Sequence, residues 1–128
     1  MKTLHRLNRG FTLIEVVIVV GCIALLSAMV VPKVIGLFST GTTTMAITRA
    51  EALNGAMFTY NQKIPSAAVN WAAAPDNPSM YLLLYNAAYL PNEARTLAGF
   101  EPSGFTYSFP AALTGRVTIT GPSGVVSY

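Results

Sequence analysis

The chain has 128 residues, of which 52% are hydrophobic, with eight Lys and Arg against five Asp and Glu. Three of the basic residues, Lys2, Arg6 and Arg9, lie in the first ten positions, which leaves five basic against five acidic residues in the remainder. That remainder has no Lys or Arg cluster able to neutralise several phosphates, so the composition argues against a nucleic-acid-binding protein.

An apolar run occupies residues 11–31 and ends just before Pro32. As a helix rising 1.5 Å per residue it would be about 31 Å long, which is enough to cross the hydrocarbon layer of a membrane. Basic residues precede the run, whereas only Lys33 follows it closely. This asymmetry predicts an amino terminus in the cytoplasm and a remainder outside the cytoplasmic membrane.

Glu15 is the only charged residue of the apolar run. A carboxylate within a membrane helix costs about 2.5 to 3.5 kcal/mol, and such residues usually have a partner and a function. The string Arg9-Gly10-Phe11-Thr12-Leu13-Ile14-Glu15 resembles the type III signal of type IV pilins and type II secretion pseudopilins. In that family a short basic leader precedes this motif, and a proline ends the apolar segment as Pro32 does here.

The resemblance implies a precursor that a prepilin peptidase cuts between Gly10 and Phe11 and methylates on the new Phe11 amine. Gly10 suits a peptidase cleft because glycine permits an extended backbone that is closely approached. The carboxylate of Glu15 would pair with the Phe11 amine of a neighbouring subunit, since opposite charges relieve one another in a low dielectric. Glu15 is therefore the expected assembly residue.

The implied partners are the prepilin peptidase, other pilin or pseudopilin subunits including copies of this chain, and an assembly platform in the inner membrane. The precursor would span the bacterial cytoplasmic membrane once, and the mature subunit would enter a periplasmic or surface filament. The small head and the single cysteine, Cys22, favour a pseudopilin over a pilin, because many pilins carry a disulfide in the head.

Two alternatives remain open. Val19-Val20-Gly21-Cys22 resembles the lipobox of bacterial lipoproteins, which predicts an acylated Cys22 on a lipid-anchored envelope binding protein. Against it, Glu15 would lie in the signal core, and the apolar segment 23–31 follows the cysteine where lipoproteins turn polar. A permanently anchored single-span binding protein is the other alternative. An ordinary secretory signal fits poorly, because no small-x-small cleavage site ends the run.

Beyond the apolar run, Pro32 should kink or loosen the helix, because proline lacks a backbone donor. The later positions Ala46, Ala50, Leu53, Met57 and Tyr60 recur at intervals of four and three, which predicts one face of an amphipathic helix. We expect this long helix to cover residues 11–62 and its face to receive the head.

Residues 64–78 contain three prolines and read as a loop, with Trp71 as its anchor to the core, whereas residues 79–89 predict a short helix. Alternating apolar residues at 105–109 and 116–120, together with the segment 125–128, predict three short strands separated by glycine-rich turns.

The predicted fold class is α+β, with a long apolar amino-terminal helix that continues into an amphipathic helix packed against a small antiparallel sheet. Three parts follow from this: a cleaved basic leader at 1–10, the long helix at 11–62 with its membrane and filament-core half at 11–31, and a small α+β head at 63–128.

Enzyme chemistry has little support in this sequence. His5 is the only histidine, and it lies in the predicted leader. No Gly-x-Ser-x-Gly motif or phosphate-binding glycine loop is present, and Asp76, Glu93 and Glu101 are too scattered to form a calcium site. We therefore expect a structural subunit without a metal or cofactor.

Overall fold

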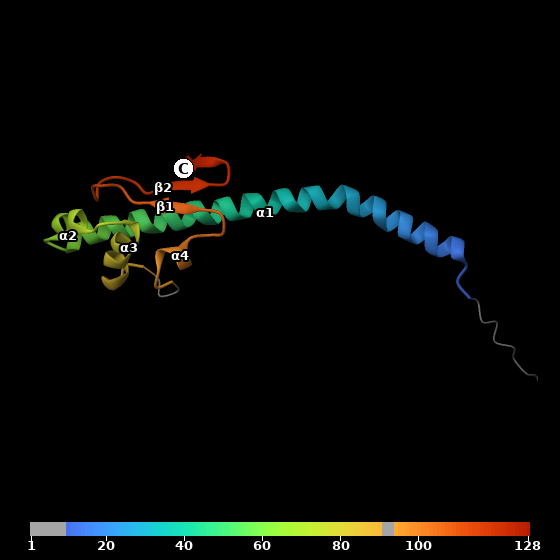
Figure 1. Cartoon of the computed structure of the whole chain (residues 1–128), viewed down its shortest axis with the longest axis horizontal. Coiled ribbons are helices and arrows are strands. Elements are labelled where there is room, and N and C mark those ends of the chain that lie inside the picture. Colours follow the sequence, from blue (N-terminus) through green and yellow to red (C-terminus); the bar gives the residue numbers. More distant parts are fainter. Residues whose placement is uncertain (1–9, 91–93) are drawn as a thin grey trace, which may run out of the picture. The chain divides into compact units, whose positions relative to one another are not determined.

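A computed structural model describes residues 10–90 and 94–128 of the chain. The chain divides into two compact units, Met1–Phe38 and Ser39–Tyr128. The described elements are the helices α1 (Leu13–Lys63), α2 (Ala67–Ala73), α3 (Asn77–Asn86) and α4 (Leu97–Phe100), and the strands β1 (Thr106–Ser108), β2 (Thr118–Gly121) and β3 (Gly124–Val126) (Figure 1). This architecture confirms the α+β class predicted from the sequence.

The described part of the first unit consists of a short lead-in followed by the apolar portion of α1. Every residue from 10 to 38 is exposed. Pro32 lies inside α1, and the chain is helical on both sides of it. The kink expected at Pro32 stays a prediction.

In the second unit, one face of α1 forms the floor of the hydrophobic core. The five residues predicted from the spacing are all buried, at 4% exposure or less, and Ala56 joins them. Alanines on this face let the sheet and the short helices approach closely, whereas Leu53, Met57 and Tyr60 fill the space between them. The predicted contact face is therefore confirmed.

The sheet is antiparallel, with the strand order β1-β2-β3. Tyr107 of β1 lies opposite Ile119 of β2, and both are buried while their strand neighbours are exposed. A strand alternates its side chains between two faces, so this register places one face of the sheet on the core. All three expected strands are present, each shorter than its predicted segment.

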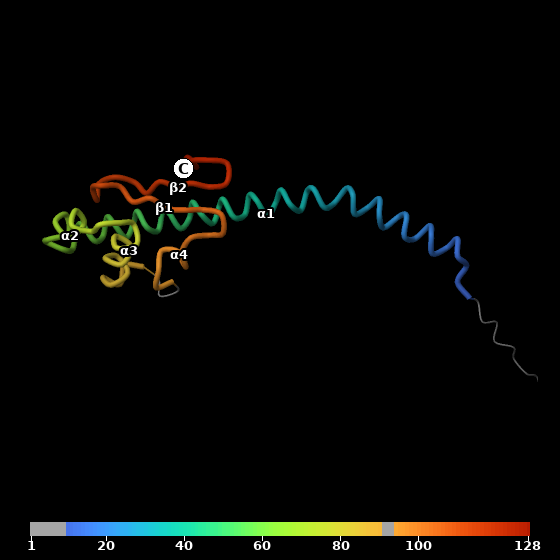
Figure 2. Tube along the Cα trace, viewed as in Figure 1, coloured from blue at the N-terminus to red at the C-terminus, as the bar shows by residue number. Residues whose placement is uncertain are grey.

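Within the second unit the sheet lies alongside the carboxyl-terminal part of α1 (Figures 1 and 2), and hydrogen bonds join this part of the helix to β1 and to residues next to β2 and β3. The hydroxyl of Tyr107 donates to the carbonyl of Ala46 at 2.9 Å, and burial raises the pKa of Tyr107 to about 12. The side-chain carbonyl of Asn54 accepts from the Val117 amide at 2.9 Å, and its amide group donates to the hydroxyl of Tyr128 at 3.1 Å. Asn54 thus connects α1 to two separate segments of the carboxyl-terminal third.

The segment 64–78 is not the loop that its prolines suggested, because it contains helix α2. Pro65 and Pro75 flank this helix rather than interrupt it, and the alanines between them favour helix formation. Trp71 is 1% exposed, its indole N–H donates to the Pro110 carbonyl at 2.9 Å, and its ring meets Phe109 edge to face. The role of Trp71 as an anchor is confirmed.

The next helix, α3, begins and ends earlier than predicted. Asp76 caps it by accepting from the Ser79 amide at 2.9 Å, which lowers the pKa of the Asp76 carboxyl, and a proline occupies its first turn. It ends at Asn86, and Ala88 adopts a positive φ of 59°. The predicted segment 79–89 therefore overestimated the end of the helix by three residues, and α4, which has only four residues, was not predicted.

Replacing Asn54 by Ala should destabilise the head, because the buried Val117 amide loses its acceptor. We expect a decrease of about 1 to 3 kcal/mol in the free energy of unfolding. Urea unfolding of the full chain in detergent micelles, followed through Trp71 fluorescence, would measure it. The exposed Gln62→Ala, on the same helix, is the matched control, and equal stability of the two variants would contradict the prediction.

Candidate functional site

The start of α1 is closed by two residues that cap each other. Thr12 immediately precedes the first helical residue, and its hydroxyl oxygen accepts from the Glu15 amide at 3.3 Å. In return, one oxygen of the Glu15 carboxylate accepts from the Thr12 amide and from the Thr12 hydroxyl, both at 3.0 Å. This reciprocal arrangement is a capping box, which satisfies amides that the first turn of a helix otherwise leaves unpaired.

The capping box fixes where the helix begins and therefore which residues precede it. Gly10 and Phe11 are exposed and lie outside the helix. A Cβ added at Gly10 would meet no atom of residues 10–90 or 94–128 within 4 Å, so packing among the described residues does not require glycine at this position. The Gly10–Phe11 peptide bond is consequently accessible and lies next to a well-defined helix start.

The carboxylate of Glu15 also faces the positive end of the helix dipole, because it lies in the first turn. Within the described residues, the hydrogen bonds to this carboxylate are accepted by Oε2. Capping therefore holds the carboxylate at the helix start and stabilises its charge. The same geometry leaves part of the carboxylate available to a cation outside the chain.

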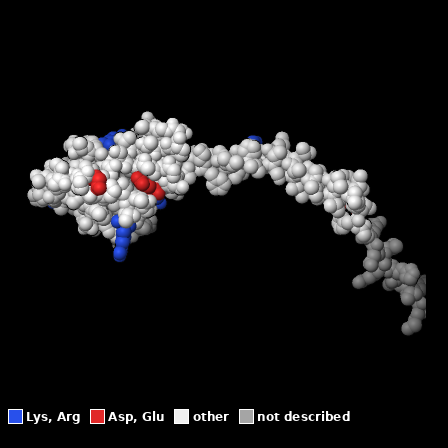
Figure 3. Space-filling model, viewed as in Figure 1, with Lys and Arg blue, Asp and Glu red and all other residues white. Residues whose placement is uncertain are grey.

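The helix that follows has an apolar surface. Among the described residues, α1 is the one helix long and apolar enough to cross a membrane, judged by length and composition, and its most apolar stretch buries nothing within the chain. Between residues 10 and 38, Glu15 and Lys33 are the only charged side chains. Figure 3 shows this segment almost entirely without charged atoms.

Residues 5–31 match a family model described as the prokaryotic N-terminal methylation motif. The chain carries a prepilin signal. This signal is the one found in type IV pilins and pseudopilins, and it marks structural, membrane-anchored precursors. Searches of curated proteins and of solved structures found no match to the chain.

The structure brings some of the predicted site residues together and separates others. Phe11 is adjacent to the pair of Thr12 and Glu15 at the helix start, within the prepilin signal. Pro32 lies far along α1 and takes no part in this cluster, and Cys22 is exposed inside the helix. The basic residues of the leader lie outside the described residues.

Thr12 caps α1 and was not among the site residues predicted from the sequence. Its signal was present, because a threonine followed three positions later by glutamate before an apolar run is the pattern of a capping box. From the prepilin signal, the Glu15 carboxylate was predicted to pair with the amine of a neighbouring subunit. The structure shows that the same carboxylate already has an internal one.

Replacing Thr12 by Ala should fray the first turn of α1, because a helix loses about 1 kcal/mol with its cap. The amides of Glu15 and Val16 bond to Thr12, and we expect their hydrogen exchange to become roughly fivefold faster. Mass spectrometry of the full chain in detergent micelles would measure it. Thr12→Ser keeps a hydroxyl cap and should exchange like the unmodified chain; equal exchange in both variants would show that the cap is not formed.

Proposed function

We propose that this protein is a structural subunit of a type IV pilus-like filament or a type II secretion pseudopilus, and that it has no enzymatic activity. One observation carries the proposal: the prepilin signal runs directly into a helix whose apolar surface is entirely exposed from residue 13 to residue 38. In water such a surface would be strongly unfavourable. A membrane and then a filament core would each cover it.

Three parts of the chain take separate roles in this proposal. Residues 1–10 are a basic leader that the prepilin peptidase removes, and Phe11 becomes a methylated amino terminus. The long helix, predicted for residues 11–62 and observed at Leu13–Lys63, follows, and residues 11–31 are the part that spans the cytoplasmic membrane and later enters the filament core. Residues 63–128 supply the head. The exposure of Gly10 and Phe11 ahead of the helix supports cleavage between them.

Assembly then depends on Glu15 in the mature subunit. The capped carboxylate pairs with the Phe11 amine of a neighbouring copy or of another pilin when the subunits dock on the inner-membrane assembly platform. The pairing compensates both charges in an apolar environment, where either one alone would be costly. The filament then extends into the periplasm or onto the cell surface.

Gly10→Glu should leave the precursor uncut. The described part of the chain has room for a side chain at Gly10, so a failure of cleavage would reflect the fit of the peptidase rather than misfolding of that part. Intact-mass and amino-terminal analysis of chain from cells containing the peptidase would check it. We expect methylated Phe11 in the unmodified chain and intact Met1 in the variant. Acylated Cys22 in the unmodified chain would instead establish a lipoprotein.

Glu15→Val and Glu15→Gln should both insert in the membrane but reduce assembled filament by at least about tenfold, because neither can pair with a cationic amine. The Gln variant is the sharper test, since glutamine retains the capping hydrogen bond to Thr12 and loses only the charge. Quantification of sheared filaments against membrane-bound subunit would measure the effect. Normal assembly by Glu15→Gln would remove charge pairing from the mechanism.

A further inference from the structure

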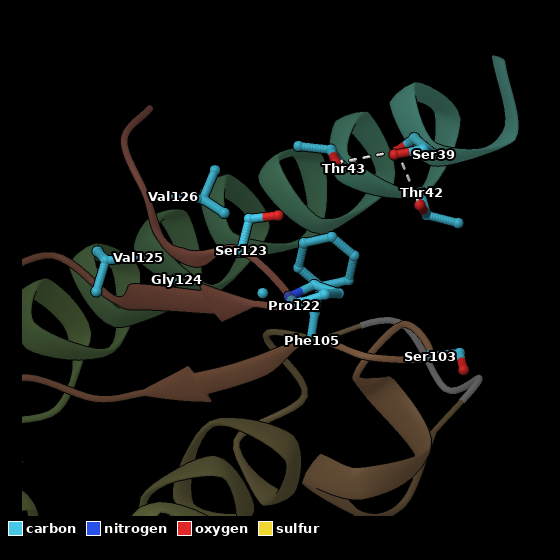
Figure 4. Close-up of a pocket in the computed structure, with 11 residues that line it drawn as sticks. Ser39, Thr42, Thr43, Ser103, Phe105, Pro122, Ser123, Gly124, Val125 and Val126 are labelled. Atoms are coloured by element: carbon cyan, nitrogen blue, oxygen red, sulfur yellow. Dashed lines mark hydrogen bonds between the residues drawn. The ribbon is translucent and has the colours of Figure 1, made fainter. Parts of the chain in front are cut away.

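A pocket of about 430 Å³ lies within the second unit, between α1 and the turn that joins β2 to β3 (Figure 4). Pockets that hold small molecules commonly measure roughly 300 to 1,000 Å³. Five of the lining side chains carry hydroxyl groups, and none of the lining residues is charged. The hydroxyl-bearing residues are Ser39, Thr42, Thr43, Ser103 and Ser123. We call this site the hydroxyl pocket.

Close packing fixes the apolar side of the hydroxyl pocket. The ring of Phe105 lies against Gly121, where an added Cβ would come within 2.7 Å of the ring. Glycine is therefore needed for the hairpin to approach the aromatic side chain. Pro122, Val125 and Val126 extend this apolar side around the turn (Figure 4). The pocket consequently combines an apolar wall with a hydroxyl-bearing one.

The threonine hydroxyls of α1 that line the pocket act as hydrogen-bond donors to the helix backbone. Thr43 donates its hydroxyl hydrogen to the Ser39 carbonyl at 3.0 Å, and Thr42 donates to the same carbonyl at 2.9 Å. A hydroxyl that has donated its hydrogen still offers oxygen lone pairs. The Thr43 oxygen therefore presents an acceptor to a ligand, which must supply the donor. The serine hydroxyls can rotate to donate or to accept.

The lining residues determine which chemical classes of ligand the hydroxyl pocket can bind. An anion would find no lysine or arginine among the lining residues, and a metal cation would find no carboxylate. A purely apolar ligand would desolvate several hydroxyls without replacing their hydrogen bonds. The remaining class is neutral, rich in O–H donors, and apolar on one face.

We propose that the hydroxyl pocket binds a neutral saccharide unit. A sugar hydroxyl donates to the Thr43 oxygen of α1, and the C–H face of the ring rests against the apolar wall at Phe105 and Pro122. This site lies in the second unit, so the proposal does not depend on cleavage, methylation or filament assembly. Its failure would leave the proposed function unaffected.

Titration of the ¹⁵N-labelled full chain with a neutral methyl glycoside and a short neutral oligosaccharide would test the proposal. The micelles need a detergent without a sugar head group, because a glucoside or maltoside would occupy the site. We expect shifts confined to the amides around Thr43 and the β2–β3 turn, with a dissociation constant on the order of a few millimolar for one sugar. The absence of shifts at roughly ten times that concentration would overturn the proposal.

Thr43→Val tests the acceptor directly, and Thr48→Val is its matched control. Thr48 lies on the same helix and donates to the carbonyl four residues earlier at 3.0 Å, as Thr43 does, but it does not line the pocket. We expect Thr43→Val to weaken binding about fivefold and Thr48→Val to leave it unchanged. Equal effects of both variants, or binding of a uronate as tight as that of the neutral sugar, would contradict the assignment.

Discussion

One constraint organises the molecule: the described chain leaves the apolar side chains of α1 exposed from residue 13 to residue 38. Residues 10–38 are exposed throughout, and the described charges among them are only Glu15 and Lys33. Hydrophobic surface of this extent must be removed from water by something outside the chain. A membrane and a bundle of identical helices are both able to cover it, and a filament precursor needs each of them in turn.

Glu15 is compatible with both environments because of its local hydrogen bonds. A helix start in an apolar medium leaves backbone amides without partners, and a carboxylate there lacks hydration. Thr12 and Glu15 reduce both penalties, since the amide of each residue bonds to the side chain of the other. The Glu15 carboxylate therefore has hydrogen-bond donors within its own chain, whether or not a neighbouring subunit is present.

Sequence patterns predicted those parts of the fold that depend on local periodicity. The buried face of α1 followed from its spacing, and the strands followed from alternation. Helix α2 was missed because its flanking prolines resembled a loop, although they mark its ends. The bonds from Asn54 to Val117 and Tyr128 have no local signal, since they join segments far apart in the chain. At the site, Gly10, Phe11 and Glu15 belong to a recognisable motif, whereas the hydroxyl pocket exists only after α1 and the β2–β3 turn meet.

The buried core occupies a different stretch of the chain from the exposed apolar segment. Every buried hydrophobic residue of the described chain lies between Ala46 and Ile119, and none belongs to residues 10–38. Whatever surrounds the apolar segment therefore meets side chains that are not among the buried residues of that core. The buried core and the exposed apolar segment thus occupy separate stretches of the chain, so a substitution in one removes no side chain from the other.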